Sequence, residues 1–503
     1  MYTLSPETIK YADKLAAEEY SIPELTLMRN AAKSCFDYIE KCITKEDKMV
    51  ILCGKGNNGG DGYEIASLMK TSGYDITVIN VFDSTPSTET ALTVYKECSE
   101  KGVGVVSLEN GYEAINSADV IIDAIFGVGF YGCIDKESDL GKVIDVCNSL
   151  DVLRIAIDTP SGINSADGRC DGVAFRANFT LTMAFIKTGM LSYPAKEYCG
   201  EIEIVNIGYP KELNEKIPKD ALVADRIYLR EVLPKRKVNT HKGNYGRLLM
   251  YCGSYNMTGA AILAATGALR TGCGLVNIAR DTRTLDILKM HLTEPIFSEV
   301  SDNNKADEVL SLSQKATAVL IGCGLGKEES DRDVLYTLIK NADCNLIIDA
   351  DGINLLCENK HILREAKKTP VLTPHPLEFA RLIGKTTEEV QSNRLNLAKE
   401  FAKDFGCVVL LKGASTVIAS PDGKIAVNTT GNPGLSKGGS GDVLAGIIAS
   451  FASQGISPFD SAVIGANLHG KAADMLKVEL SEYGILPSDL PLAVAKLLPY
   501  NSY

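Results

Sequence analysis

Short apolar segments alternate with longer segments of helical periodicity along nearly the whole chain. The short segments are rich in β-branched residues and apolar at almost every position, which is typical of strands covered on both faces of a parallel sheet. This alternation predicts an α/β fold with doubly wound sheets, in which ligands bind at the carboxyl ends of the strands. The ranges predicted as strands are 49–53, 76–82, 120–124, 154–157, 179–184, 247–252, 318–321, 346–348, 371–373 and 408–412.

The length of the chain predicts more than one domain. A chain of 503 residues exceeds what one ordinary hydrophobic core supports. Residues 209–220 are polar and charged and include two prolines, a composition that is common in linkers. We therefore expect two three-layer α/β domains, residues 1–215 and residues 216–503.

Composition and charge exclude several classes of protein. The chain is 45% hydrophobic and 23% charged, as globular proteins are, and its net charge of −12 argues against binding of nucleic acid. The first residues contain no basic segment followed by an apolar one, and no run of 18 apolar residues occurs. We expect no signal peptide, no membrane partner and a cytoplasmic location. The 14 cysteines form no C-x-x-C pair, so most should be buried thiols in a reducing compartment.

A glycine-rich segment, residues 54–62, follows the first predicted strand and precedes a helix predicted over 63–70. Five of its nine residues are glycine, so backbone N–H groups could surround an anion without obstruction by Cβ atoms. A strand, a glycine loop and a helix N-terminus together form the arrangement that holds phosphate groups. The spacing matches neither a Walker A loop nor a dinucleotide fingerprint. The alternative is a tight turn without a ligand.

Acidic residues stand at two further strand ends in the first part of the chain. Asp123 lies in the strand predicted over 120–124, and Asp158 follows the strand predicted over 154–157. Acids at these positions are well placed for catalysis or cation binding, although helix caps and solvated turn acids also occur there. With the asparagines of the glycine-rich segment they offer hard oxygen ligands, which suit an alkali or alkaline-earth cation.

Segments 54–63, 123–129, 157–162 and 193–200 resemble the NAD(P)H-hydrate epimerase domain, which has a Rossmann-like fold. The resemblance implies that Asp158 is the catalytic acid or base, and that potassium binds near Asn58, Asp123 and Ser161. Segment 27–32 departs from the family pattern at Arg29 and Ala32, which leaves its role open. The resemblance also implies that the hydrated dinucleotide is held by Asn57, Asn58, Gly59, Gly60, Asp61, Gly127, Val128, Gly129, Phe130, Tyr131, Gly132, Cys133 and Asp158.

A second glycine-rich segment of different design opens a strongly apolar helix late in the chain. Residues 438–442 read Gly-Gly-Ser-Gly-Asp, and residues 443–448 continue as the helix. Backbone N–H groups there could stabilise charge on a transferring phosphoryl group, while Asp442 accepts a proton from an attacking hydroxyl. The alternative is that Asp442 only caps the helix; the two roles are compatible.

Segments 253–261, 270–276, 322–326, 349–354, 373–378 and 411–416 resemble the nucleotide-dependent NAD(P)H-hydrate dehydratase, a ribokinase-like enzyme. Cys323 stands where proline is common in that family. His375 lies between two prolines, whereas His469 is expected to pack or cap. The resemblance implies that Asp442 is catalytic, that the adenine nucleotide contacts Lys412, Gly413, Ala414, Ser415, Thr416 and Gly441, and that the hydrate contacts Ala260, Gly324, His375 and Asp442.

Taken together, the two resemblances imply a bifunctional isomerase and lyase that repairs NAD(P)HX, the hydrated forms of NADH and NADPH. They also imply ADP as co-substrate, K⁺ and Mg²⁺ as cofactors, and a homo-oligomer. Phosphorylation of the C6 hydroxyl would help dehydration, because the conjugate acid of hydroxide has a pKa of about 15.7 and that of phosphate about 6. Two alternatives stay open: a small-molecule kinase with an accessory dinucleotide-binding domain, and an N-terminal domain that only binds.

Overall fold

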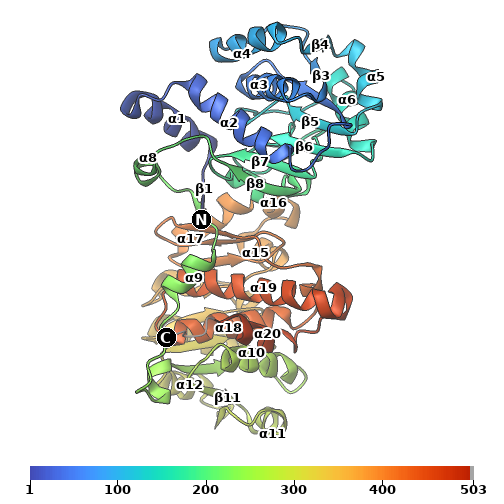
Figure 1. Cartoon of the computed structure of the whole chain (residues 1–503). Helices are drawn as coiled ribbons and strands as arrows, with labels where there is room; N and C mark the ends of the chain where they lie inside the picture. Colours follow the sequence, from blue (N-terminus) through green and yellow to red (C-terminus); the bar gives the residue numbers. More distant parts are fainter. Residues whose placement is uncertain (499–503) are drawn as a thin grey trace. The chain divides into compact units, whose positions relative to one another are not determined.

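A computed structural model describes residues 1–498 and divides them into two compact units (Figure 1). The N-terminal unit is Tyr2–Ala221, and the C-terminal unit consists of Met1 and the described chain from Leu222 onward. Each unit contains a mainly parallel sheet with helices on both faces, so the predicted α/β class is confirmed. The functional boundary between residues 215 and 216 stays a prediction.

The sheet of the N-terminal unit is entirely parallel, with the order β4-β3-β2-β5-β6-β7-β8. The strand order reverses between β2 and β5, and ligands of doubly wound folds bind at such switch points. The strands are β2 (Lys48–Cys53), β3 (Asp75–Asn80), β4 (Gly104–Ser107), β5 (Val120–Ala124), β6 (Leu153–Ile157), β7 (Phe179–Met183) and β8 (Glu201–Val205).

Alternate residues of these strands enter two separate hydrophobic cores. Met49 and Ile51 pack beneath one layer of helices, whereas Val50 and Leu52 pack against the opposite layer. This two-sided burial explains why the strands are apolar at nearly every position. The first layer consists of α2 (Glu24–Ile39), α3 (Asn57–Thr71) and α4 (Glu89–Glu100), and the second contains α5 (Tyr112–Asn116) and α6 (Asp139–Ser149).

Helix α3 begins at Asn57, so the expectation of a loop over residues 57–62 was wrong. The glycines let the helix pack closely against the strand ends, because they have no Cβ atom. A Cβ atom on Gly59 would lie 2.0 Å from the carbonyl oxygen of Gly54, and one on Gly62 would lie 2.7 Å from the Cβ of Ala124. The glycine density therefore brings the start of α3 against the strand ends and points its free N–H groups toward the carboxyl edge of the sheet.

Two predicted strands of this unit end earlier than expected. The strand predicted over 76–82 ends at Asn80, whose side chain accepts a hydrogen bond from the Phe82 N–H (3.3 Å) and donates one to the Ser84 carbonyl (2.8 Å). The strand predicted over 179–184 ends at Met183, because Ala184 takes a left-handed backbone with φ 56°. Such local turn chemistry is hard to read from apolar runs.

The sheet of the C-terminal unit includes the order β18-β17-β16-β15-β14-β13-β10-β11-β12. It is parallel from β12 to β16, and β17 and β18 continue it as an antiparallel meander. The strands are β10 (Arg247–Tyr251), β11 (Leu275–Arg280), β12 (Ile296–Glu299), β13 (Ala318–Ile321), β14 (Asn345–Ile348), β15 (Val371–Leu372), β16 (Val408–Leu411), β17 (Thr416–Ala419) and β18 (Ile425–Asn428).

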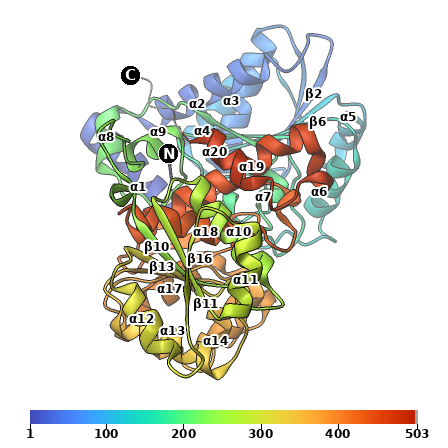
Figure 2. The same cartoon turned by 90° about the horizontal axis from the view of Figure 1, so that it is seen from below.

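Helices cover both faces of this second sheet, as Figures 1 and 2 show. One face packs against α10 (Thr258–Arg270), α11 (Thr282–His291), α18 (Ser440–Ser453) and α19 (Pro458–Gly484), and α20 (Leu490–Leu497) packs on α19. The other face carries α12 (Lys305–Ser313), α13 (Glu329–Asn341), α14 (Asp351–Leu356) and α17 (Arg394–Phe405).

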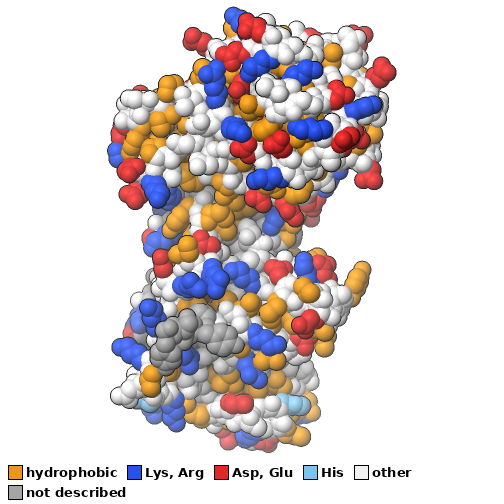
Figure 3. Space-filling view, in the orientation of Figure 1, with side chains coloured by type: hydrophobic (Ala, Val, Ile, Leu, Met, Phe, Trp, Pro, Cys, Tyr) orange, Lys and Arg blue, Asp and Glu red, His pale blue; other side chains and the backbone are white. Residues whose placement is uncertain are grey.

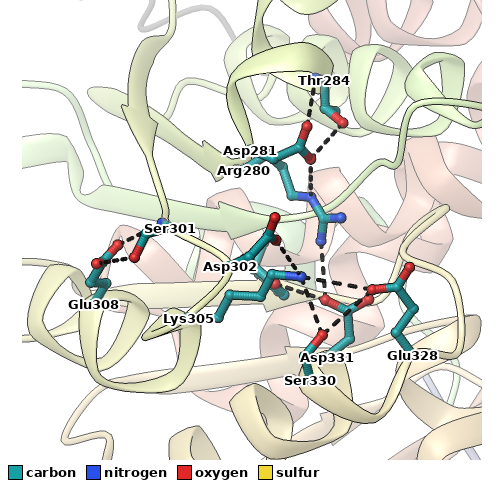
Figure 4. A network of polar contacts seen from close by, with 11 residues as sticks. Arg280, Asp281, Thr284, Ser301, Asp302, Lys305, Glu308, Glu328, Ser330 and Asp331 are labelled. Carbon is teal, nitrogen blue, oxygen red and sulfur yellow. Dashed lines mark hydrogen bonds and ion pairs between the residues drawn. The ribbon is translucent and has the colours of Figure 1, made fainter.

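A network of ionic contacts, buried at Arg280 and Asp331, lies at the end of β11 and the starts of α12 and α13 (Figure 4). Arg280 is 7% exposed and its Nη1 lies 3.4 Å from Asp331 Oδ1, which also accepts a hydrogen bond from the Tyr251 hydroxyl at 2.7 Å. Lys305 Nζ lies 3.0 Å from Asp302 Oδ1 in the same network. Because Arg280 is buried, loss of its partner Asp331 would leave an uncompensated buried charge and destabilise the fold.

Charged side chains of both signs lie on the surface, and most of the cysteines lie inside. On the face drawn in Figure 3, acidic and basic side chains are interspersed, and no extended basic patch is visible. Among residues 1–498, no helix combines the length and the apolar character needed to cross a membrane. The cysteines are free thiols, and most of them are buried, as predicted.

Candidate active sites

A cavity of about 730 Å³ opens at the carboxyl ends of β2, β5, β6 and β7, at the switch point of the N-terminal sheet. Gly59 and Gly60, which were expected at the substrate, do not line it, because both pack inward from α3. A Cβ atom on Gly60 would lie 2.7 Å from the Met28 Cε. Gly132 and Cys133 also lie outside the lining. The expected residues that do line the cavity are Asn57, Asn58, Asp61, Gly127, Val128, Gly129, Phe130, Tyr131 and Asp158.

Asp158 follows β6 directly and presents its carboxylate to this cavity. It is 6% exposed, and its backbone is left-handed with φ 68°, a conformation that is uncommon outside glycine. Its Oδ2 accepts a hydrogen bond from the Val128 N–H at 3.0 Å, and its Oδ1 accepts one from the Lys187 ammonium. The buried Lys187 ammonium compensates the charge of the Asp158 carboxylate.

Lys187 is a residue that the sequence analysis missed. It is 1% exposed, and its Nζ also donates to Thr182 Oγ1 (2.9 Å) and to the Met183 carbonyl (3.3 Å). A buried ammonium requires such partners, and Asp158 supplies the compensating charge. A single lysine inside the apolar segment 183–191 was the available signal, but a lysine in such a segment is usually at the surface.

Three more carboxyl groups, those of Asp13, Glu24 and Asp61, line the same cavity. Asp13 accepts a hydrogen bond from the Tyr209 hydroxyl, and burial raises the pKa of Asp13. No described residue donates a hydrogen bond to the carboxyl group of Asp61, which is 6% exposed. Burial, and then the charge of Asp158, raises the pKa of Asp61 well above its ordinary value. The cavity thus combines a carboxylate that is paired with a buried ammonium and a carboxyl group that favours its proton.

Of the expected potassium ligands, Asn58 lines this cavity, whereas Asp123 and Ser161 are buried outside its lining. The Asp123 carboxylate accepts hydrogen bonds from Ser161 Oγ and the Ser161 N–H, both at 2.7 Å, and from the Ile125 N–H at 3.1 Å. Burial raises the pKa of Asp123 to about 6. The amide oxygen and nitrogen of Asn58 are buried and have no hydrogen-bond partner among the described residues. The Asn58 amide oxygen is therefore available to accept a hydrogen bond or to bind a cation.

In the C-terminal unit, the ends of β13 and β14 and the start of α18 bring Cys323, Asp349 and Asp442 together. One ligand atom from each of these side chains lies within 4.8 Å of the others. Asp349 Oδ1 lies 3.0 Å from Lys412 Nζ and accepts a hydrogen bond from Thr373 Oγ1 at 2.6 Å. The expected catalytic residue Asp442 therefore lies beside a buried acid–lysine pair.

Asp442 is the third residue of α18, and Gly439, with φ 105°, occupies the cap position. The alternative that Asp442 only caps the helix therefore finds no support in the structure. Burial, and then the charge of Asp349, raises the pKa of Asp442 to about 6. A Cβ atom on Gly441 would lie 3.3 Å from Lys412 Nζ, so glycine leaves room for the ammonium at the helix start.

The expected nucleotide contacts Lys412, Gly413, Ala414, Ser415 and Thr416 form the connection from β16 to β17. Arg394, which the sequence analysis missed, donates hydrogen bonds to the backbone of this connection and of the preceding strand end. Its Nη2 donates to the carbonyl oxygens of Leu411 (2.9 Å), Lys412 (3.0 Å) and Ser415 (3.4 Å). The guanidinium therefore fixes the backbone on which Lys412 stands.

The expected hydrate contacts include two neighbouring small residues and a histidine that caps a helix. Ala260 and Gly324 lie together, because a Cβ atom on Gly324 would be 2.7 Å from the Ala260 Cβ. His375 caps α15 (Pro376–Ile383): its Nδ1 accepts from the Glu378 N–H at 3.2 Å, and burial lowers the pKa of His375. Whether His375 also binds a ligand stays a prediction. His469 is buried as expected, and burial lowers its pKa to about 4.

Asp349 is a further residue that the sequence analysis missed, although it lies in segment 349–354 and a signal was present. It follows the apolar strand β14 directly, as Asp158 follows β6. The rule that singled out Asp158 therefore applies to Asp349 as well. Its partner Lys412 stands at the end of β16, two strands away, and that proximity depends on the strand order, which local sequence does not reveal.

Comparisons with known proteins agree on both units. Residues 24–189 match the family model described as YjeF-related protein N-terminus, and residues 248–495 match the model described as NAD(P)H-hydrate dehydratase. A bifunctional NAD(P)H-hydrate repair enzyme from Moorella thermoacetica is 35% identical, with 99% of this chain and 96% of the relative covered. The Escherichia coli enzyme of the same name is 32% identical over 96% and 93%.

Among solved structures, an ADP/ATP-dependent NAD(P)H-hydrate dehydratase from Bacillus subtilis is 31% identical, covers 55% of this chain and 98% of its own, and has a TM-score of 0.48. The full-length relatives match both units in one continuous alignment and at nearly their whole length. This chain therefore belongs to the family of bifunctional NAD(P)H-hydrate repair enzymes.

Proposed function

We propose that the chain repairs hydrated nicotinamide dinucleotides in two steps. The N-terminal unit interconverts the R and S forms of NAD(P)HX at C6, and the C-terminal unit converts the S form to NAD(P)H while ADP becomes AMP and phosphate. The observation that carries this proposal is the match of repair enzymes to 99% of the chain. That coverage favours repair over a small-molecule kinase with an accessory domain, because it includes both units in order.

The cavity of the N-terminal unit supports epimerisation through Asp158. Inversion at C6, which bears the ring nitrogen and a hydroxyl group, needs a group that accepts a proton and one that donates it. The carboxylate of Asp158 is the acceptor, since the Lys187 ammonium and the Val128 N–H hold it in place at the cavity. The apolar lining of the same cavity would shield the nicotinamide ring from bulk water.

Asn58, Asp123 and Ser161 fit the potassium ion that the family resemblance implies. The buried Asn58 amide oxygen receives no hydrogen bond from a described residue, so it is free to bind a cation. The Asp123 carboxylate and the Ser161 hydroxyl are hard oxygen ligands, which suit an alkali cation. When bound, the ion would supply positive charge near the anionic dinucleotide. Asp123 and Ser161 hold each other in place, so they would keep the β5 and β6 ends in register for Asp158.

In the C-terminal unit, Asp442 would take the proton of the C6 hydroxyl as that oxygen attacks the terminal phosphoryl group of ADP. The N–H groups at the start of α18 and the Lys412 ammonium would balance the charge on the phosphoryl oxygens. Asp349 holds Lys412 at the end of β16 and raises the basicity of Asp442. Loss of the resulting phosphate with a C5 proton restores the dihydropyridine ring.

The residues around Asp442 could supply only part of the coordination shell of Mg²⁺. Cys323 offers a thiol, which is a poor ligand for Mg²⁺, and Asp349 is already paired with Lys412. The nucleotide phosphates and water would therefore complete the coordination, with Asp442 nearby. When bound with ADP, the ion would supply further positive charge at the transferring phosphoryl group.

The test is incubation of the purified chain with a mixture of R- and S-NADHX, with and without ADP. We expect the two epimers to equilibrate without ADP, and we expect ADP to release NADH, AMP and phosphate in equal amounts until both epimers are consumed. A kinase would instead accumulate a phosphorylated compound without NADH. An unchanged epimer ratio without ADP would contradict the role assigned to the N-terminal unit.

A further inference from the structure

The cavity of the N-terminal unit holds more carboxyl groups than cations. Asp13, Glu24, Asp61 and Asp158 line it together with Lys10, Lys55 and Lys187, and of these three ammonium groups Lys187 is the buried one. Lys187 donates to Asp158 Oδ1, so its charge is committed to Asp158. The two buried carboxyl groups, Asp61 and Asp158, thus share one buried cation, which favours a proton on Asp61, the group that lacks this partner.

The partners of these groups single out Asp61. Asp13 has the Tyr209 hydroxyl, and Glu24, which is exposed, accepts hydrogen bonds from Asn57 Nδ2 and Thr90 Oγ1. Asp61 is 6% exposed, and none of residues 1–498 donates a hydrogen bond to its carboxyl group. A buried carboxylate without a donor or a cation is costly, whereas a buried carboxylic acid is much less so.

We infer that Asp61, in the first turns of α3, is the general acid of epimerisation and the counterpart of the base Asp158. Burial and the charges of Asp158, Asp13 and Glu24 favour the protonated form of Asp61, and Lys187 opposes them less strongly. A carboxyl group that favours its proton and a second one that is paired with an ammonium can supply the acid and the base that catalysis at neutral pH requires. This inference rests on the proposed function of the N-terminal unit.

Besides the substrate and the two carboxyl groups, the proposed step needs only water. Asp61 gives its proton to the C6 hydroxyl oxygen, the C6–O bond breaks with its electron pair on oxygen, and the lone pair of N1 forms an N1=C6 iminium. Asp158 takes a proton from a water molecule whose oxygen bonds to C6 on the other face, and the π pair returns to N1. Solvent then returns the proton from Asp158 to Asp61, and the reverse epimerisation exchanges the two roles.

The test compares Asp61→Asn with the wild-type chain, in the absence of ADP, by chromatography of R- and S-NADHX. Asparagine keeps the shape but carries no transferable proton, so we expect kcat for epimerisation to fall by about 10²–10⁴-fold with KM changed by less than about threefold. Glu64→Gln is the matched control: Glu64 is also a buried acid on α3 but does not line the cavity, and we expect it to keep the wild-type rate. Circular dichroism establishes that each variant is folded.

Two further readouts separate catalysis from binding. In the wild type, kcat should fall at high pH as Asp61 loses its proton, and Asp61→Asn should lack this alkaline limb. In H₂¹⁸O, label should enter C6 at the rate of epimerisation. Asp61→Asn with an unchanged kcat and a raised KM, or epimerisation without label, would overturn the assignment. If the wild-type chain itself leaves R and S unequilibrated, the proposed function of the unit fails instead.

Discussion

Asp158 carries the clearest prediction for a single residue. Asp158→Asn removes the proton acceptor, so we expect epimerisation to slow by about 10²-fold or more. Because the variant keeps the size of the side chain, the unit should stay folded, and ADP-dependent dehydration of pure S-NADHX should continue at its wild-type rate. The rates are measured separately, with single epimers. An unchanged epimerisation rate would assign Asp158 to positioning alone.

Asp442 makes a second prediction, in which stability and activity change in opposite directions. Its pKa is raised from 3.8 to about 6 in the folded chain, so the folded state binds more protons than the unfolded state between these pH values. The free energy of unfolding therefore decreases as the pH rises through this window, by up to about 3 kcal/mol, and the loss persists at neutral pH.

Asp442→Asn removes this charge. We expect the variant to lose dehydration and to gain roughly 1–3 kcal/mol in the free energy of unfolding at pH 7.5, with little gain at pH 4. Urea unfolding at the two pH values measures the difference. If Asp442→Asn changed the free energy of unfolding equally at both pH values, ionisation of the Asp442 carboxylate would not destabilise the folded chain. For the wild type, kcat/KM of dehydration should decline as the pH falls through about 6, where Asp442 becomes protonated.

At the scale of elements, the start of α3 depends on close contact with the strand ends. Gly59→Ala would place a Cβ atom 2.0 Å from the Gly54 carbonyl oxygen, whereas Gly56→Ala would meet no atom within 4 Å. We expect Gly59→Ala to lower the free energy of unfolding by more than about 2 kcal/mol and to impair epimerisation, since overpacking against backbone cannot relax easily. Gly56→Ala, with φ −94°, should change stability by less than about 0.5 kcal/mol.

Denaturant unfolding of both variants, followed with epimerisation assays, checks this pair. A Gly59→Ala protein as stable as Gly56→Ala would show that the helix start can move away from the sheet.

The ionic network at the end of β11 gives an element-scale prediction for the other unit. Asp331→Ala leaves the buried Arg280 guanidinium and the Tyr251 hydroxyl without their shared acceptor (Figure 4). Breaking a buried ion pair from one side typically costs about 3–5 kcal/mol, so we expect a loss of that size in the C-terminal unit. Lys289→Ala, which removes an exposed ion pair with Asp286, should cost less than about 1 kcal/mol. Calorimetry of the two variants would contradict the account if the losses were alike.

Sequence patterns predicted the elements well where burial on both faces produces an unbroken apolar run. The strands β5 and β13 have the predicted ends. The start of α3 was misplaced because a glycine required for close packing looks the same in sequence as a glycine required for a turn. The antiparallel strands β17 and β18 were not predicted as a pair, since their short apolar runs do not reveal strand direction.

The site residues divide in a similar way. Asp158 and Asp442 follow visible local patterns, a strand end and a glycine-rich helix start. Lys187 and Arg394 do not, because each acts through contacts with segments that only the fold brings close. A buried cation is recognised by its partners, and partners distant in sequence are invisible in a single chain.

At the scale of the whole molecule, two units with separate chemistry share one polypeptide. The pairing has a chemical reason: a dehydratase that accepts one C6 epimer leaves the other unused, and an epimerase returns it to the usable form. Each candidate site lies within one unit, with Asp158 in Tyr2–Ala221 and Asp442 in the unit that follows. We therefore expect a lesion in one site to leave the other activity intact.

The most direct test uses an equimolar mixture of R- and S-NADHX with excess ADP, and follows NADH release together with the amount of each epimer. The wild-type chain should convert the whole mixture. Asp158→Asn should stop near the amount of NADH that the S epimer supplies, and Asp442→Asn should equilibrate the epimers and release neither NADH nor phosphate. Complete conversion by Asp158→Asn at the wild-type rate, or ADP-dependent NADH release by folded Asp442→Asn, would contradict the account.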